Sequence, residues 1–201
     1  MRINIAFEDM LQEAALEKIF SALNCSFTIV NRLSHNGKGY LKKNIQAFNK
    51  SSTDIPLVLI TDLDTSPCPP ALIASWLPGM LNENFLFRVA VTEVESWLIA
   101  HKDAFSSYIG IPKNKINFDP ETIKDPKEFV VNLAKKSKSR DIRYDLLPGP
   151  KSGAHVGPNY NGCLAEFIIQ HWDPLIAREY SASLSKAMRA VTNLHARISK
   201  Q

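Results

Sequence analysis

The segment Leu57–Asp64 constrains the fold more than any other, because a run of branched apolar residues ends there in two aspartates. Turn-forming residues flank the run at 51–54 and 66–70, so it is too short for a helix and typical of a strand. Its apolarity is continuous, as in a strand covered on both faces of a parallel sheet. Ligands bind beyond the carboxyl ends of such strands. The sequence therefore predicts a buried strand that delivers Asp62 and Asp64 to a site.

Two interpretations of this aspartate pair remain open. Side chains at Asp62 and Asp64 point to opposite faces while the strand persists, so both reach one cation only if the chain turns at Leu63. The only basic residue within 44–84 is Lys50, which leaves the pair without a neutralising neighbour in sequence. A hard divalent cation is the usual remedy, and we favour a metal site over a polar loop after a core strand.

Strands and helices alternate along the first half of the chain. Besides the central strand, the patterns predict strands at 2–7, 26–30 and 85–91, and helices at 10–23, 41–48, 71–76 and after residue 91. Such alternation is typical of a parallel sheet with helices on both faces. The second half predicts helices at 126–138, 164–172 and 181–194. We expect an α/β fold, with a mostly parallel, Rossmann-like four-stranded core over 1–105 and a helical elaboration over 106–201 packed on it.

Carboxylates follow three of the four predicted strands. Glu8 ends the first strand, the aspartate pair ends the central one, and Glu93 and Glu95 follow the last. The carboxyl ends of parallel strands meet at one edge of a sheet, so these side chains are expected to gather there. Thr92 and Glu95 also have the spacing of a capping box, which would use Glu95 on the first turn of its own helix. The two roles for Glu95 are equally compatible with the sequence.

Composition limits the class of protein without choosing a function. A formal net charge of +4 and a pI near 8.9 permit nucleic-acid binding but do not require it. Cys25, Cys68 and Cys163 form no C-x-x-C pair, which argues against a zinc site or a disulfide framework and favours a reducing cytoplasm. We expect no signal peptide, because Glu8 and Asp9 come early, and no membrane span, because no apolar run is long enough.

Two glycine-containing segments are candidate phosphate contacts. The segment 148–162 holds four of the eight glycines together with Lys151 and His155, a fixed positive charge and a group that titrates near neutrality. We expect this loop to fold toward the carboxylates, with Lys151 on a phosphate; a surface connection without a ligand is the alternative. Lys38 lies in the turn Asn36-Gly37-Lys38-Gly39, which lacks the full phosphate-loop pattern, so an ordinary turn is favoured there. A further basic stripe occupies 135–143.

Glu8, the pair Asp62-Leu63-Asp64 and the order of elements between them resemble the Toprim domain. This is the metal-binding α/β domain of topoisomerases, primases and nucleases of the overcoming-lysogenization-defect type. With Gly37-Lys38-Gly39, the segment Glu93–Leu98 and the segment Ser181–Leu184, nearly the whole chain is similar to a Toprim-like family of uncharacterised bacterial domains. Some members of that family sit beside ABC-type ATPases in phage-defence loci.

The resemblance implies a nuclease that acts on DNA or RNA with Mg²⁺ or Mn²⁺ and has an ATPase partner. Asp62 and Asp64 would hold the ion, and Glu8 would be a ligand or a general acid or base. Glu95 and Glu93 would complete the cluster. A mechanism with two metal ions is a hypothesis that such a cluster permits.

Two other functions remain open. The segment Asp62-Leu63-Asp64-Thr65 also fits the D-x-D-x-T signature of haloacid-dehalogenase-like phosphatases, with Asp62 as nucleophile and Asp64 as acid. The third possibility is a degenerate Toprim-like binding or sensing subunit. It is supported by Asp9 and Gln12, which stand where the family pattern has a glycine and an acidic residue. Asp9 instead has the position of a helix N-cap, with Gln12 as its reciprocal partner.

Overall fold

A four-stranded sheet forms the centre of the structure, a computed structural model that describes residues 1–34 and 37–200. Its strands are β1 (Arg2–Ala6), β2 (Thr28–Leu33), β3 (Leu57–Asp62) and β4 (Phe85–Ala90). All neighbours pair in parallel, in the order β2-β1-β3-β4. The chain adds β2 on one side of β1 and then returns to add β3 and β4 on the other. The sheet therefore changes its direction of growth between β1 and β3, where α/β proteins bind ligands.

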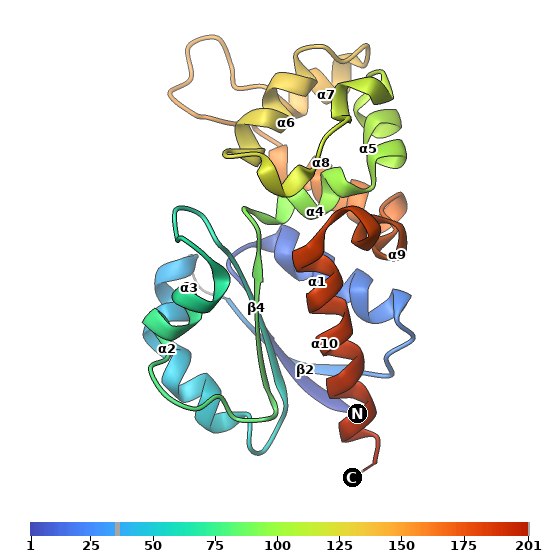
Figure 1. The fold of residues 1–201 in the computed structure, drawn as a ribbon. Helices are drawn as coiled ribbons and strands as arrows, with labels where there is room; N and C mark the ends of the chain where they lie inside the picture. The colour runs from blue at the N-terminus through green and yellow to red at the C-terminus, as the bar shows by residue number, and fades with distance from the viewer. Residues whose placement is uncertain (35–36, 201) are drawn as a thin grey trace.

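Helices cover both faces of this sheet, as the sequence predicts. The helices α1 (Met10–Ala22) and α10 (Ala182–Ile198) pack on one face, and α2 (Lys38–Ser51) and α3 (Pro69–Trp76) on the other (Figure 1). All six residues of β3 are buried, which explains why its apolarity does not alternate. The predicted α/β class with a parallel sheet is confirmed.

The N-terminus of α1 is fixed by its cap. The Asp9 carboxylate accepts hydrogen bonds from the backbone N–H groups of Leu11 (2.9 Å) and Gln12 (3.2 Å), which confirms the predicted N-cap. The Gln12 side chain returns to the backbone N–H of Glu8 (2.9 Å), one residue before the cap. Asp9 and Gln12 together therefore hold Glu8 in place after β1.

The remaining helices gather beyond the carboxyl ends of the strands, at the upper end of Figure 1. They are α4 (Val94–Ala100), α5 (Lys102–Ile109), α6 (Pro126–Ala134), α7 (Arg140–Leu146), α8 (Tyr160–Gln170) and α9 (Pro174–Ala177), with 3₁₀ turns at Lys113–Ile116, Pro120–Thr122 and Arg178–Tyr180. One apolar core runs from β1 and α1 through α4 into α8 and α10. In the described part of the chain, no helix is long and apolar enough to cross a membrane.

Several predicted boundaries were wrong. The helix expected at 126–138 ends at Ala134, and a further helix, α7, which the sequence analysis did not predict, begins at Arg140. Ser139 caps α7 by accepting from the Ile142 N–H (3.3 Å). The second strand runs to Leu33 because it pairs with β1 along its whole length. The helix predicted from Leu41 begins at Lys38, and Asn36 of the preceding turn lies outside the described residues.

Candidate functional site

Glu8 and Asp62 meet at the point where the sheet changes direction. Glu8 follows β1 by two residues, and Asp62 is the last residue of the neighbouring strand β3. The Glu8 carboxylate accepts hydrogen bonds from the backbone N–H of Asp62 (3.0 Å) and from the Thr61 hydroxyl. The first strand's carboxylate is therefore anchored directly to the end of the central strand.

Asp62 is nearly inaccessible to solvent, with 4% of its surface exposed. Its Oδ1 accepts a hydrogen bond from the backbone N–H of Val94 (2.9 Å), which ties β3 to the first turn of α4. Burial raises the pKa of Asp62 well above its ordinary value, and the negative charges of Glu95 and Glu8 raise it further. Asp62 therefore lies among like charges that favour either a proton or a cation beside it.

Glu95 is the most deeply buried member of this group, with none of its surface exposed. Its Oε1 accepts a hydrogen bond from the Tyr160 hydroxyl of α8 (3.3 Å), and its Oε2 is buried without a partner among the described residues. Burial raises the pKa of Glu95 to about 7, although the nearby Lys127 ammonium opposes that rise. A buried carboxylate oxygen without a partner is costly, so it marks a place for a proton or an ion.

The capping-box alternative for Glu95 is wrong. The Thr92 hydroxyl donates to the backbone carbonyl of Ile123 (2.8 Å), and α4 begins after Glu93 without a side-chain cap. Glu95 lies in the first turn of that helix and points into the interior, toward Tyr160. Thr92 has the right spacing to cap α4, but its hydroxyl is bonded instead to Ile123, the residue that follows the 3₁₀ turn Pro120–Thr122.

Lys127 is the counter-charge of the cluster, and the sequence interpretation did not include it. Its Nζ lies 3.5 Å from Glu93 Oε1 and 3.9 Å from Glu95 Oε1, and its backbone N–H donates to Glu93 Oε2 (3.3 Å). Burial lowers the pKa of Lys127, but the charges of Glu95, Glu93 and Asp62 outweigh it and raise the pKa overall. Asp125 caps α6 and Glu128 lies in its first turn, so negative charge already stands beside Lys127 in the sequence. The local sequence therefore held no signal that Lys127 pairs with Glu93 and Glu95.

Asp64 lies in a different environment from Asp62. It adopts a left-handed backbone conformation (φ 50°), and its Oδ2 is 2.6 Å from the Lys38 ammonium. Lys38 also donates to the backbone carbonyl of Asp62 (2.8 Å). The expectation that no basic side chain neutralises the pair was wrong for Asp64, because Lys38 reaches it from α2, outside the sequence window. Lys38, a predicted phosphate contact, is bound to this aspartate.

The donors at this edge fit a hard cation in chemistry but not in their present arrangement. Glu8, Asp62 and Glu95 supply carboxylate oxygens, the ligands that Mg²⁺ prefers, and Glu95 Oε2 has no other partner. Within residues 1–34 and 37–200, however, no three or more His, Cys, Asp or Glu side chains are placed to hold a metal ion. Glu93 faces Lys127, and Asp64 faces Lys38. The inner carboxylates are therefore the ones that could hold an ion.

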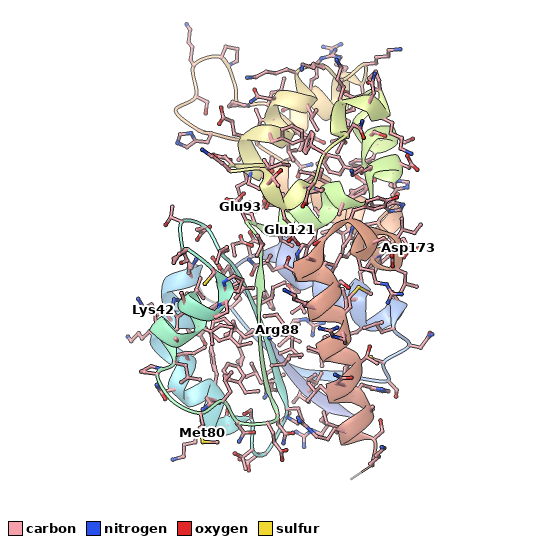
Figure 2. All side chains as sticks on the ribbon, in the orientation of Figure 1. Lys42, Met80, Arg88, Glu93, Glu121 and Asp173 are labelled. Atoms are coloured by element: carbon pink, nitrogen blue, oxygen red, sulfur yellow. The ribbon has the colours of Figure 1, made fainter. Side chains whose placement is uncertain are left out.

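The glycine-rich loop between α7 and α8 carries two candidate residues, His155 and Lys151. Only His155 approaches the carboxylate cluster. His155 lines a pocket of about 670 Å³ together with Glu93 and Lys127. Lys151 is exposed, does not line that pocket, and has no hydrogen bond or ion pair with any other described residue. The loop projects from the helical end of the molecule in Figure 1, whereas Glu93 lies at the junction with the sheet in Figure 2.

Gln12 also belongs to this site, since it is fully buried beside Glu8. Its Oε1 is bonded to the Glu8 backbone, while its Nε2 is buried without a partner in the described structure. A neutral amide therefore occupies the position where the resemblance places an acidic residue. This removes one negative charge from the cluster.

Comparison of the chain with family models, with curated proteins and with solved structures gives no match.

Proposed function

We propose that this chain is a Toprim-like phosphodiester hydrolase that acts on nucleic acid with Mg²⁺ or Mn²⁺. One observation carries the proposal: Glu8 and Asp62 are bonded together at the point where the parallel sheet changes direction, and the buried Glu95, from the helix after β4, acts on Asp62 with a third negative charge. Placing like charges together in a buried position destabilises a fold, so such an arrangement is typical of functional sites. The unpartnered Oε2 of Glu95 supports a cation there.

The side chains have distinct roles in this proposal. Asp62 and Glu95 would hold the ion, since both are buried and both have a raised pKa without it. The bound ion would polarise a phosphoryl oxygen and acidify a water molecule. Glu8 is partly accessible and oriented by Thr61 and the Asp62 backbone, which suits a general base that takes a proton from the attacking water. Lys127 would offset negative charge on the substrate phosphate.

Basic residues beside the adjoining pocket support nucleic acid as the substrate class. The pocket lining itself is mixed in charge, with Lys127, Lys135 and His155 as its basic residues and Glu93, Asp125 and Glu128 as its acidic ones. The segment that follows carries the further basic residues Lys136, Lys138, Arg140 and Arg143. Cations of this kind contact phosphates independently of base sequence. The proposal extends to an ABC-type ATPase as partner, to phage defence as the biological role and to the cytoplasm as the location.

A phosphatase of the haloacid-dehalogenase type is less compatible with this geometry. Its nucleophile must reach a phosphorus atom, but Asp62 is 4% exposed and already accepts a hydrogen bond from the Val94 backbone. Its acid must be free to transfer a proton, but Asp64 is paired with Lys38. Neither residue is presented for that reaction.

A binding or sensing subunit is the second candidate, and Lys127 is the observation that favours it. Its ammonium lies between Glu93 and Glu95, where it supplies positive charge that a metal ion would otherwise bring. Together with the neutral Gln12, this arrangement describes a Toprim-like site that has replaced its metal by a lysine.

Titration with Mg²⁺ and Mn²⁺, followed by cleavage assays on single-stranded DNA, duplex DNA and RNA, distinguishes these candidates. We expect cation binding by calorimetry and a Glu8→Gln variant that folds normally but loses about 10²-fold or more in cleavage rate. Glu83→Gln is the matched control, because Glu83 is exposed at the opposite, amino end of β4. Nucleic-acid binding without cation binding or cleavage would replace the hydrolase by the binding subunit. Turnover of p-nitrophenyl phosphate with beryllium fluoride trapped on Asp62 would replace it by the phosphatase.

A further inference from the structure

A cavity of about 310 Å³ lies against the free edge of the sheet, outside the carboxylate cluster. The edge strand β4 contributes Phe87, Arg88 and Val89 to it, and α3 and α10 form its sides. The volume is at the lower end of the range for small-molecule pockets. Most of the lining is apolar, including Pro69 and Ile73 from α3. The cavity therefore has room and walls for a compact apolar group.

Arg88 brings a positive charge into this apolar surrounding without an ion-paired carboxylate. It is labelled on β4 in Figure 2, and it forms no ion pair with any Asp or Glu in the described ranges. Burial lowers the pKa of Arg88, but a guanidinium stays charged at any ordinary pH. Its Nε donates to the backbone carbonyl of Phe87 (2.8 Å). The other guanidinium nitrogens make no hydrogen bond within the described structure.

The cavity has two other charged side chains, one positive and one negative. Lys186 of α10 lines the cavity, is exposed and has no ion pair with a described residue. Glu121 also lines it, but its Oε1 accepts from the Ser181 hydroxyl (2.6 Å) and the Ser183 backbone N–H (2.7 Å). The cavity thus presents two cations that form no ion pair and one carboxylate that caps the start of α10, so the charge of its lining is positive overall.

Two of the outward backbone groups of β4 already have hydrogen-bond partners. This favours a small ligand over a peptide that would pair with the strand. Arg88 takes the Phe87 carbonyl, and the Val91 N–H donates to the Ser183 hydroxyl (3.3 Å). A peptide that paired with β4 as an added strand would have to break both bonds, because it needs the outward groups of the edge. A ligand that contacts side chains alone leaves them intact.

We propose that this cavity binds a small amphiphilic anion, with its apolar body against Pro69, Phe87 and Val89 and its acidic group on Arg88 and Lys186. Such a ligand supplies the negative charge that Arg88 lacks and fills an apolar space that water occupies poorly. The site is separate from the carboxylate cluster. It does not depend on the proposed hydrolase activity.

Thermal denaturation and calorimetry with phenylacetate and indole-3-acetate test this inference, with phenylacetamide and inorganic phosphate as the two half-probes. At about ten times its dissociation constant, either carboxylate should raise the melting temperature by roughly 3–6 °C. Arg88→Met keeps the apolar stem and should weaken binding about tenfold or more, because it removes charge-assisted hydrogen bonds. Lys186→Met, on an exposed position that cannot disturb the core, should weaken binding by a smaller factor. Arg189→Met on the exposed side of α10 is the matched control and should bind as the unchanged protein does.

Three results with the small-molecule probes would overturn the inference. They are equal binding of phenylacetamide and phenylacetate, wild-type affinity in both Arg88→Met and Lys186→Met, and no shift with either carboxylate at millimolar concentration. Binding of an extended acidic peptide in the absence of carboxylate binding would also overturn it, since the edge of β4 would then be the site. If Arg88→Met does not fold, the result with Lys186→Met decides.

Discussion

Asp62 and Asp64 are separated by one residue, yet they lie in two regions of different chemistry. Asp62 faces inward, beneath α4, where it shares a buried volume with Glu95. Asp64 faces outward, beside α2, and its side chain is 40% exposed and paired with Lys38. Each region contains one lysine. In the inner region, four carboxylates act on Lys127, whereas in the outer region one carboxylate faces one ammonium. The four are those of Glu95, Glu93, Asp62 and Asp9.

The different surroundings of Asp62 and Asp64 show that a D-x-D pair does not by itself define a site with two carboxylates. The chain leaves β3 at Asp62, and the backbone N–H groups of Leu63 and Asp64 both donate to the Thr92 carbonyl (3.0 and 3.1 Å). That turn carries Asp64 into solvent and leaves Asp62 in the interior. An excess of buried negative charge remains only on the inner side, so any cation or catalytic proton belongs there.

The largest expected difference between the two aspartates is in catalysis. If the inner region is the active site, Asp62→Asn should lower the cleavage rate about 10³-fold, while Asp64→Asn should lower it by less than about tenfold. Asp54→Asn is the control, because it makes the same change in an exposed residue at the amino end of β3. Initial-rate cleavage assays measure all three. An equal loss in the two aspartate variants would show that both regions act on one ion.

The second expected difference is in the pH dependence of stability. Glu95 has a pKa of about 7 in the metal-free fold and an ordinary value of 4.5, so the folded state binds the extra proton. Its contribution to stability is therefore fully present below about pH 4.5 and is lost as the pH rises through about 7, by an amount on the order of 3 kcal/mol. Urea denaturation across this window should show a flatter curve for Glu95→Gln. Glu83→Gln should follow the wild-type curve; the prediction fails if Glu95→Gln does so as well.

The third difference concerns the two lysines. Lys127→Met leaves Glu93 and Glu95 without their cation and should destabilise the fold by about 2 kcal/mol at neutral pH, less than for a fully buried pair because Lys127 is 38% exposed. Lys38→Met breaks a partly exposed pair and should cost less than about 1 kcal/mol. The free energy of unfolding from urea titrations measures both. Equal losses would mean that the inner region carries no excess of negative charge.

The smallest effect is expected outside both regions, at Lys151. Since that side chain is exposed and makes no bond to another described residue, Lys151→Ala should change stability by less than about 0.5 kcal/mol. If the loop contacts a phosphate, the variant should reduce the slope of log affinity against log salt by about 1 and leave the rate at saturating substrate unchanged. Binding measured at several salt concentrations tests this. A loss of catalytic rate would instead place Lys151 in the inner region.

The fold was largely predictable, because its signals are local in sequence. Continuous apolarity at Leu57–Ile60 predicted a doubly covered strand, and the position of Asp9 predicted a helix cap; both are confirmed. The helix α7 was missed because its arginines were interpreted as part of a basic stripe, although Ser139 could have indicated a new helix start. Boundaries depend on which backbone groups find partners, as in β2, which extends to match β1.

The sequence by itself determined that carboxylates would follow three parallel strands and share one edge, because the parallel direction of the strands is a consequence of alternation and apolar burial. It could not determine which carboxylates are neutralised. Lys38 and Lys127 reach Asp64 and Glu93 from helices 26 and 34 residues away in the chain, and Tyr160 reaches Glu95 across 65. Only the tertiary structure decided those pairings, because charges interact through space and desolvation depends on the packing of every neighbouring element.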